Sequence, residues 1–104
     1  MVLLRQEIGD VLRTHRQERG QTLRQVASKA SVALGYLSEV ERGQKEVSSE
    51  ILASVAEALE VPLYIVMRDV SERLASVEGM YFDDTFIPDT VPDDFVTEAE
   101  LYSH

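Results

Sequence analysis

The chain has 104 residues, of which 44% are hydrophobic and 28% are charged; this is enough for one small globular domain with an extension. It contains no cysteine, which excludes disulfide bonds and thiolate metal sites. Its N-terminus does not read as a signal peptide and no apolar run reaches membrane-spanning length, so we expect a cytoplasmic protein without a membrane partner.

The charge is unevenly distributed along the chain, whose net charge is −9. Residues 1–45 carry eight basic and five acidic side chains, a net charge of +3, whereas residues 46–104 carry two basic and fourteen acidic ones, a net charge of −12. Because attraction to phosphate depends on the local field, the basic first half is compatible with nucleic-acid binding. The acidity of the second half is explained at least as well by a role in solubility alone as by a role in binding.

A first helix is predicted over residues 3–19, ended by Gly20. Its apolar stripe recurs at spacings of three and four, at Leu4, Ile8, Val11, Leu12 and His15. No second histidine or cysteine lies near His15 in the sequence. We therefore expect His15 to be a partly buried, hydrogen-bonded side chain rather than a metal ligand.

Two short helices follow, separated by Ser31-Val32. Thr22, with Gln25 three residues later, has the capping-box pattern that opens the first of them, which ends near residue 31. The second covers about residues 33–42, and Gly43 follows it where a left-handed cap is expected. Two short helices joined so tightly within a larger helical set are typical of a helix-turn-helix.

Two longer helices are predicted next. Ser48 or Ser49 caps the first, which is broken at Val61-Pro62, and Pro62 suits the first turn of the second. Apolar residues of the second repeat at alternating steps of four and three: Leu63, Met67, Val70, Leu74 and Val77. This spacing is that of a coiled-coil seam, and it also fits a helix that simply closes the domain core.

The composition changes after Gly79. Residues 80–94 contain five aspartates, two prolines and three aromatic residues without a helical period, which predicts a loop over residues 80–91. A proline followed by two acids resembles a helix start, so a short helix is predicted over residues 92–102. We predict an all-α protein with a first domain over residues 1–68 and a C-terminal extension over residues 69–104 that is part helical and part irregular and acidic.

The string TLRQVASKASVALGYLSEVERGQKEVSSEILASVAEALEVPL, which begins at Thr22, resembles the Cro/cI-like (XRE) family of phage and bacterial repressors. The marks are Thr22, Val26-Ala27, Tyr36-Leu37-Ser38, Glu41-Arg42-Gly43 and Ala58-Leu59-Glu60-Val61-Pro62. With the first helix, the resemblance covers roughly residues 5–68. It implies a five-helix, lambda-repressor-like domain that binds duplex DNA and regulates transcription. The third helix and the acidic tail are also similar to the Clp-gene regulator subgroup, whose members activate genes for ATP-dependent proteases.

The family geometry implies that the third helix lies in the major groove of DNA. Leu37 and Val40 then point into the core, and the exposed face that contacts bases is Ala33, Leu34, Gly35, Ser38, Glu39 and Arg42. The family often has a hydroxyl N-cap where Ala33 stands. The face is poor in the side chains that best discriminate guanine and adenine. We therefore expect readout through Glu39 to cytosine, methyl contacts, close backbone approach at Gly35, and DNA shape.

Polar residues around the motif are the predicted phosphate contacts: Thr22, Arg24, Lys29, Tyr36, Gln44 and Lys45. Each one alone fits a solvated surface side chain equally well, and Tyr36 also fits packing against the domain. Family resemblance further implies a structural ion pair between Arg16 and Glu41, which joins the first and third helices.

A domain of roughly 65 residues buries only about 60% of its unfolded surface and is marginally stable alone. We expect a homodimer built through residues 63–104, with an interface that includes Met67, Val70, Leu74, Val77, Tyr81, Phe82 and Phe86. The expected partners are a duplex DNA operator, a second copy of the chain and RNA polymerase.

No cofactor or metal is expected, and the absence of a phosphate loop or a spaced ligand set argues against an enzyme. Two alternatives remain open. One is an antitoxin of the same fold that represses its own operon and neutralises a partner through its acidic extension. The other is an interaction adaptor that keeps the fold without binding DNA.

Overall fold

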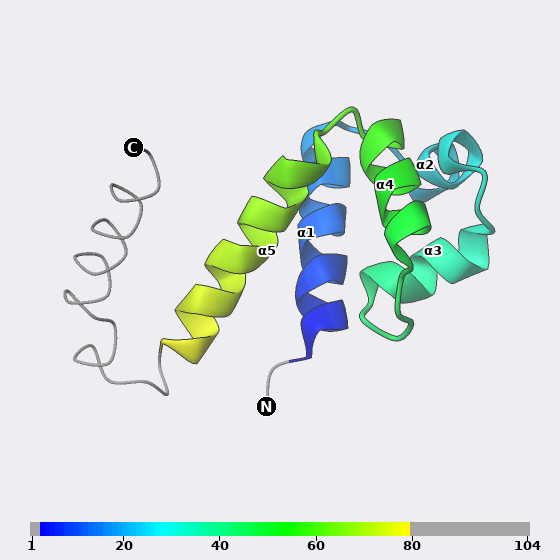
Figure 1. The fold of residues 1–104 in the computed structure, drawn as a ribbon. Helices are drawn as coiled ribbons and strands as arrows, with labels where there is room; N and C mark the ends of the chain where they lie inside the picture. The colour runs from blue at the N-terminus through cyan, green and yellow to red at the C-terminus, as the bar shows by residue number, and fades with distance from the viewer. Residues whose placement is uncertain (1–2, 80–104) are drawn as a thin grey trace, which may run out of the picture.

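The computed structural model describes residues 3–79, which form five helices and no strand. These are α1 (Leu4–Glu18), α2 (Leu23–Ala30), α3 (Leu34–Glu41), α4 (Ser49–Ala58) and α5 (Leu63–Glu78). In Figure 1, α1 lies in the middle of the domain, with α5 on one side of it and α2, α3 and α4 on the other. The all-α, five-helix prediction is confirmed. The loop and short helix predicted after residue 79 lie outside the described residues.

The ends of the helices follow the local sequence closely. Thr22 Oγ1 accepts a hydrogen bond from the Gln25 amide at 3.1 Å, and Gln25 Oε1 accepts one from the Thr22 amide at 2.8 Å, so the predicted capping box is confirmed. Ser48 rather than Ser49 caps α4 and accepts from the Ile51 amide at 3.2 Å. Pro62 precedes α5 as its N-cap instead of lying in its first turn.

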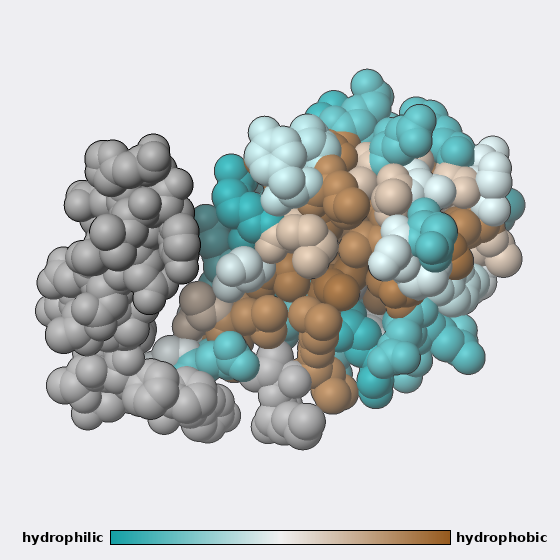
Figure 2. Space-filling view, viewed as in Figure 1, coloured by the Kyte–Doolittle hydropathy of each residue, from teal (hydrophilic) through white to brown (hydrophobic). Residues whose placement is uncertain are grey.

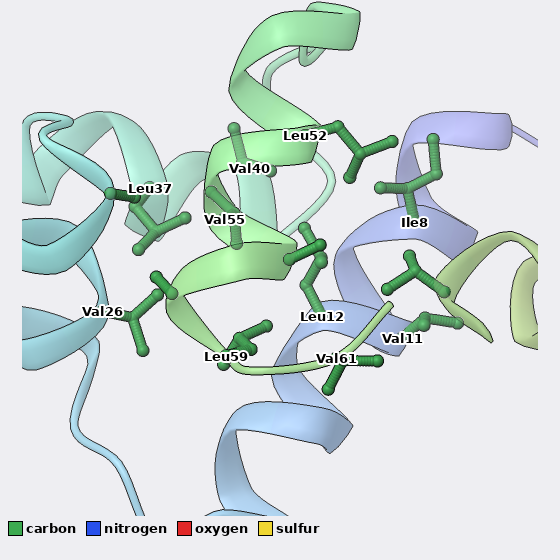
Figure 3. Close-up of a cluster of buried hydrophobic side chains, with 14 of the residues drawn as sticks. Ile8, Val11, Leu12, Val26, Leu37, Val40, Leu52, Val55, Leu59 and Val61 are labelled. Atoms are coloured by element: carbon green, nitrogen blue, oxygen red, sulfur yellow. The ribbon is translucent and has the colours of Figure 1, made fainter. Parts of the chain in front are cut away.

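The hydrophobic core lies between α1, α2, α3, α4 and α5. Figure 3 shows side chains from several helices meeting there, among them Leu12 of α1, Leu37 of α3 and Leu59 at the end of α4. Each of these three is at most 1% exposed. Full burial of a leucine side chain stabilises a fold by about 1.5–3 kcal/mol, so this cluster supplies much of the driving force for folding.

Gly9 lets α1 and α3 approach backbone to backbone. A Cβ atom added at this buried glycine would meet the carbonyl oxygen of Val40, and would lie 2.7 Å from that of Glu41. Because the carbonyl groups belong to the α3 backbone, they cannot turn aside as a side chain would. The position of α3 on the domain is therefore set by the absence of a side chain on α1.

The apolar stripe of α5 is divided between the core and the surface. Val66 and Val70 are 0% and 2% exposed, whereas Leu63 and Met67 are 40% and 44% exposed. The coiled-coil spacing did not include Val66, which is the most deeply buried residue of the helix. Val70 packs in the core of its own protomer, so its predicted place in a dimer interface is wrong.

Ion pairs extend the packing of α5 on α1 beyond residue 68. Arg73 donates to Glu7 Oε1 at 2.9 Å and to Asp10 Oδ2 at 2.7 Å. His15 Nε2 donates to Asp69 Oδ2 at 2.7 Å, which confirms that His15 is a half-buried, hydrogen-bonded side chain. The domain boundary predicted at residue 68 falls inside α5. No helix between residues 3 and 79 is long and apolar enough to cross a membrane.

Candidate DNA-binding interface

A left-handed residue makes the tight turn between α2 and α3. Ser31 has φ 59° and ψ 42°, and it ends α2. Its amide donates to the Ser28 carbonyl at 3.2 Å, and the Val32 amide donates to the Ala27 carbonyl at 3.0 Å. These two bonds satisfy carbonyl groups at the end of α2 and redirect the chain into α3. The pair α2–turn–α3 therefore has the geometry of a helix-turn-helix.

One side of α3 anchors it to the domain. Leu37 and Val40 are 0% and 1% exposed, as predicted. At the end of the helix, Gly43 adopts φ +75° and its carbonyl accepts a hydrogen bond from Arg5 Nε at 3.0 Å. The contact from Arg5 was not predicted from the sequence. An arginine in the first turn of α1 carries no local signal that its partner lies beyond α3.

The structure brings Arg16 and Glu41 together in a two-pronged ion pair. Arg16 Nε donates to Glu41 Oε2 at 2.8 Å and Arg16 Nη2 donates to Glu41 Oε1 at 3.0 Å. Arg16 Nη1 also donates to the Gln21 carbonyl at 3.1 Å, so the guanidinium ties α1, α3 and the turn before α2 together. The hydrogen bond with Glu41 raises the pKa of Arg16, although burial opposes the shift. The guanidinium of Arg16 therefore stays charged at neutral pH.

The opposite side of α3 faces outward. Of the predicted base-contacting residues, Ala33, Gly35 and Arg42 are exposed, whereas Ser38 and Glu39 are half-buried. Ala33 is the N-cap and makes no side-chain cap bond. A Cβ atom added at Gly35 would meet nothing within 4 Å, so the backbone there is open to an approaching ligand. Leu34 is half-buried against the hydrophobic core, which leaves only part of its side chain facing outward.

The predicted phosphate contacts fall into two groups. Arg24, Lys29, Gln44 and Lys45 are exposed, on α2 and on the loop that follows α3. Tyr36 donates its hydroxyl proton to the Glu46 carbonyl at 2.8 Å, whereas Thr22 Oγ1 accepts the cap bond of α2 and keeps its own proton to donate. Among the predicted phosphate contacts, Tyr36 is thus the one whose polar group is already used within the protein.

A helix-turn-helix domain model matches residues 7–64 of this chain. The chain is also 53% identical over 78 residues to the transcriptional regulator ClgR of Mycobacterium tuberculosis (strain ATCC 25618 / H37Rv), and this match covers 75% of the chain and 70% of the relative. The chain belongs to the ClgR family of helix-turn-helix regulators. Both resemblances stated from the sequence, to the Cro/cI-like regulators and to the Clp-gene regulators, are confirmed.

Solved structures support the ClgR-type fold. One crystal structure of the clp gene regulator ClgR from Corynebacterium glutamicum has 47% identity and a TM-score of 0.69, covering 72% of this chain and 97% of that one. A second crystal structure of that regulator has 36% identity and a TM-score of 0.70, covering 99% and 96% of the two chains.

The restriction-modification controller protein C.Esp1396I shares the fold at 22% identity, with a TM-score of 0.66 over 71% of this chain and 99% of that one.

As a ClgR-type protein, this chain is a DNA-binding transcriptional regulator. The regulators named here agree with the expectation that it is not an enzyme.

Proposed function

We propose that this ClgR-type regulator binds a duplex operator as a homodimer, places α3 in the major groove and activates genes of the Clp proteases. The proposed activation includes a contact with RNA polymerase. The clp gene regulator from C. glutamicum supports the choice of target genes. The observation that carries the proposal is the division of α3 into a buried anchoring side and an exposed side with an open backbone at Gly35.

Direct readout in this proposal comes from a few groups on α3. Gly35, Ser38, Glu39 and Arg42 recur at spacings of three and four, so they share one face of the helix. A carboxylate accepts a hydrogen bond from the amino group of cytosine, and an arginine pairs with guanine. Without a side chain at Gly35, the helix can approach a base edge more closely than any other residue would allow.

Phosphate binding in this proposal comes from the four exposed polar side chains at the edges of the motif: Arg24, Lys29, Gln44 and Lys45. Such contacts fix the register of the protein on the duplex without reading its sequence. Three of the four are cationic. Each neutralised phosphate contributes about −0.9 to the slope of the logarithm of the binding constant against the logarithm of the salt concentration.

The proposed dimer forms through the exposed edge of the α5 stripe. Leu63 and Met67 are large apolar side chains that are two-fifths or more exposed, and Leu74 and Val77 further along are half-buried. Figure 2 shows apolar surface gathered beside α5 on this face of the molecule. A symmetric contact along α5 would bury these side chains and place two reading helices on one side of the dimer. Tyr81, Phe82 and Phe86 of the predicted interface lie outside the described residues.

Selection of duplexes from a random pool, followed by mobility shifts of the enriched sequence, tests the proposal. The wild-type protein should enrich a two-fold symmetric sequence and bind it with steep salt dependence. Glu39→Ala should relax the base preference at the position that Glu39 contacts while leaving most of the salt slope intact. Weak, salt-insensitive binding with no enrichment would refute the proposal and favour an adaptor that does not bind DNA.

A further inference from the structure

The loop over residues 42–47, called here the α3–α4 loop, is held to α3 at two separate points. Its first half is fixed by backbone bonds, since the Gly43 amide donates to the Val40 carbonyl at 3.0 Å and the Gln44 amide donates to the Glu39 carbonyl at 2.8 Å. Its second half carries the exposed side chains of Lys45 and Glu46. There the tie to α3 is the hydrogen bond from the Tyr36 hydroxyl to the Glu46 carbonyl, 2.8 Å long.

Tyr36 is well placed to hold that loop still. It lies on α3, and its half-buried ring packs against the hydrophobic core. A ring fixed by packing presents its hydroxyl at a fixed point, and the carbonyl that accepts from it belongs to the residue after Lys45. The backbone next to Lys45 is thereby tied to the same helix that carries Gly35 and Glu39.

We infer that Tyr36 is a positioning residue for DNA binding, which sets Lys45 against the phosphate backbone in register with the reading face of α3. The inference rests on the proposed function, since it assumes that the chain binds duplex DNA through the reading face of α3. A phenol has a single proton to donate, and here the proton is directed at the Glu46 carbonyl rather than outward. Tyr36 therefore acts on DNA through Lys45 and does not need to touch the duplex.

A double-mutant cycle of Tyr36→Phe and Lys45→Ala tests the inference. The probe is a fluorescently labelled, mixed-sequence duplex of about three helical turns, titrated by anisotropy over a range of salt concentrations. Lys45→Ala should lower the salt slope by about 0.9 for each protomer bound. Tyr36→Phe removes only the hydroxyl, and it should weaken binding about threefold to tenfold, as expected for one net hydrogen bond.

The double variant decides between positioning and direct contact. If Tyr36 acts through Lys45, Tyr36→Phe causes no further loss in the Lys45→Ala background. An equal loss in both backgrounds means that Tyr36 touches DNA itself, and no loss in the wild-type background means that its hydroxyl has no role in binding. Either result overturns the inference.

Two further measurements separate this inference from the proposed function and from misfolding. Tyr64→Phe is the matched control, because Tyr64 is 71% exposed on α5; it should bind as the wild type does. In the free protein, Tyr36→Phe should shift the backbone amide resonances of residues 45–47 and leave those of α1 and α5 in place. Unshifted loop resonances overturn the inference even if DNA binding is intact. A wild-type protein that fails to bind the duplex refutes the proposed function instead.

Discussion

Arg16 connects more parts of the domain than any other side chain described above. It lies on α1, pairs with Glu41 at the end of α3 and caps the chain just before α2 through the Gln21 carbonyl. The side chain of Glu41 is 7% exposed and that of Arg16 is 17% exposed, so neither charge is well solvated. Removing one partner would leave the other buried without compensation, which costs far more than an ion pair contributes at the surface.

We therefore expect Arg16→Ala to lower the free energy of unfolding by about 3 kcal/mol, measured by chemical denaturation. Arg13→Ala is the matched control on the same helix, because Arg13 pairs with Asp10 at 3.8 Å with both side chains more than two-fifths exposed. Its effect should stay within about 0.5 kcal/mol. If Arg16→Ala abolished DNA binding with no loss of stability, the pair would have a direct role in recognition rather than a structural one.

The ionisation of Asp69 makes the stability of the fold depend on pH. Burial raises the pKa of its carboxyl group, but hydrogen bonds from His15 and Arg68 outweigh burial and leave the pKa below its ordinary value of 3.8. A depressed pKa in the folded state means that the ionised carboxylate stabilises the fold above the unfolded pKa, and that this contribution disappears as the pH falls through the folded pKa.

Comparison of the wild type with Asp69→Asn by urea denaturation checks this sign. The wild type should be the more stable protein at neutral pH. The difference should remain down to about pH 4 and shrink at more acidic values. A difference that grew on acidification would mean that the carboxylate is not the stabilising form.

At the scale of the helix, two glycines show how α1 and α3 differ in their surroundings. Gly9 faces the backbone of α3, where a Cβ atom has no room, while Gly35 faces open space on α3 itself. Neither has the positive φ angle of Gly20 and Gly43, so the same substitution to alanine is free of backbone strain at both sites. The pair therefore separates the effect of packing from the effect of helix propensity.

Gly35→Ala should raise the free energy of unfolding by about 0.5–1 kcal/mol, because alanine is the better helix former. It should at the same time weaken operator binding, because the new methyl group occupies the gap that the backbone needs. Gly9→Ala should destabilise the domain by about 1–3 kcal/mol through overpacking. Denaturation curves and mobility shifts on both variants check the pair; unchanged operator preference in Gly35→Ala would place the reading face elsewhere.

The helices and most of their ends could be predicted from the sequence, because caps, glycines and apolar spacing are local signals. The face of α5 that enters the core could not. Leu63, Val66, Met67 and Val70 are all apolar, and only the positions of α1 and α4 determine that Val66 and Val70 are buried. The contacts from Arg5 to Gly43 and from Tyr36 to Glu46 were missed for a related reason. An isolated polar side chain does not reveal which backbone carbonyl it will reach.

At the scale of the whole molecule, the basic surface and the exposed apolar surface lie on different parts of the domain. Basic side chains gather around α2 and the α3–α4 loop, while α5 presents Leu63 and Met67 to the outside. α1 lies between them, paired with α5 through Arg73 and with α3 through Arg16. In the proposed dimer along α5, α1 of each protomer would hold the dimer contact at a fixed distance from the reading helix α3.

Replacing Leu63 and Met67 together by aspartate should convert the protein to a monomer in sedimentation equilibrium, because paired charges would face each other across the symmetric contact. Affinity for a two-half-site operator should fall at least about tenfold, since binding of the second protomer is no longer assisted by the first. Ser76→Asp adds one charge at another exposed position of α5 and should leave the dimer intact. A double variant that stayed dimeric would show that other residues form the interface.

The side chains that anchor α3 are largely different from those that face outward. Leu37, Val40 and Glu41 hold the helix on the domain, while Gly35, Ser38 and Glu39 face outward, and no outward residue takes part in the Arg16 ion pair. A duplicated gene can accordingly exchange its outward residues one at a time and keep a folded product at each step. New sets of target promoters can arise in this family by such drift, without any redesign of the scaffold that carries the helix.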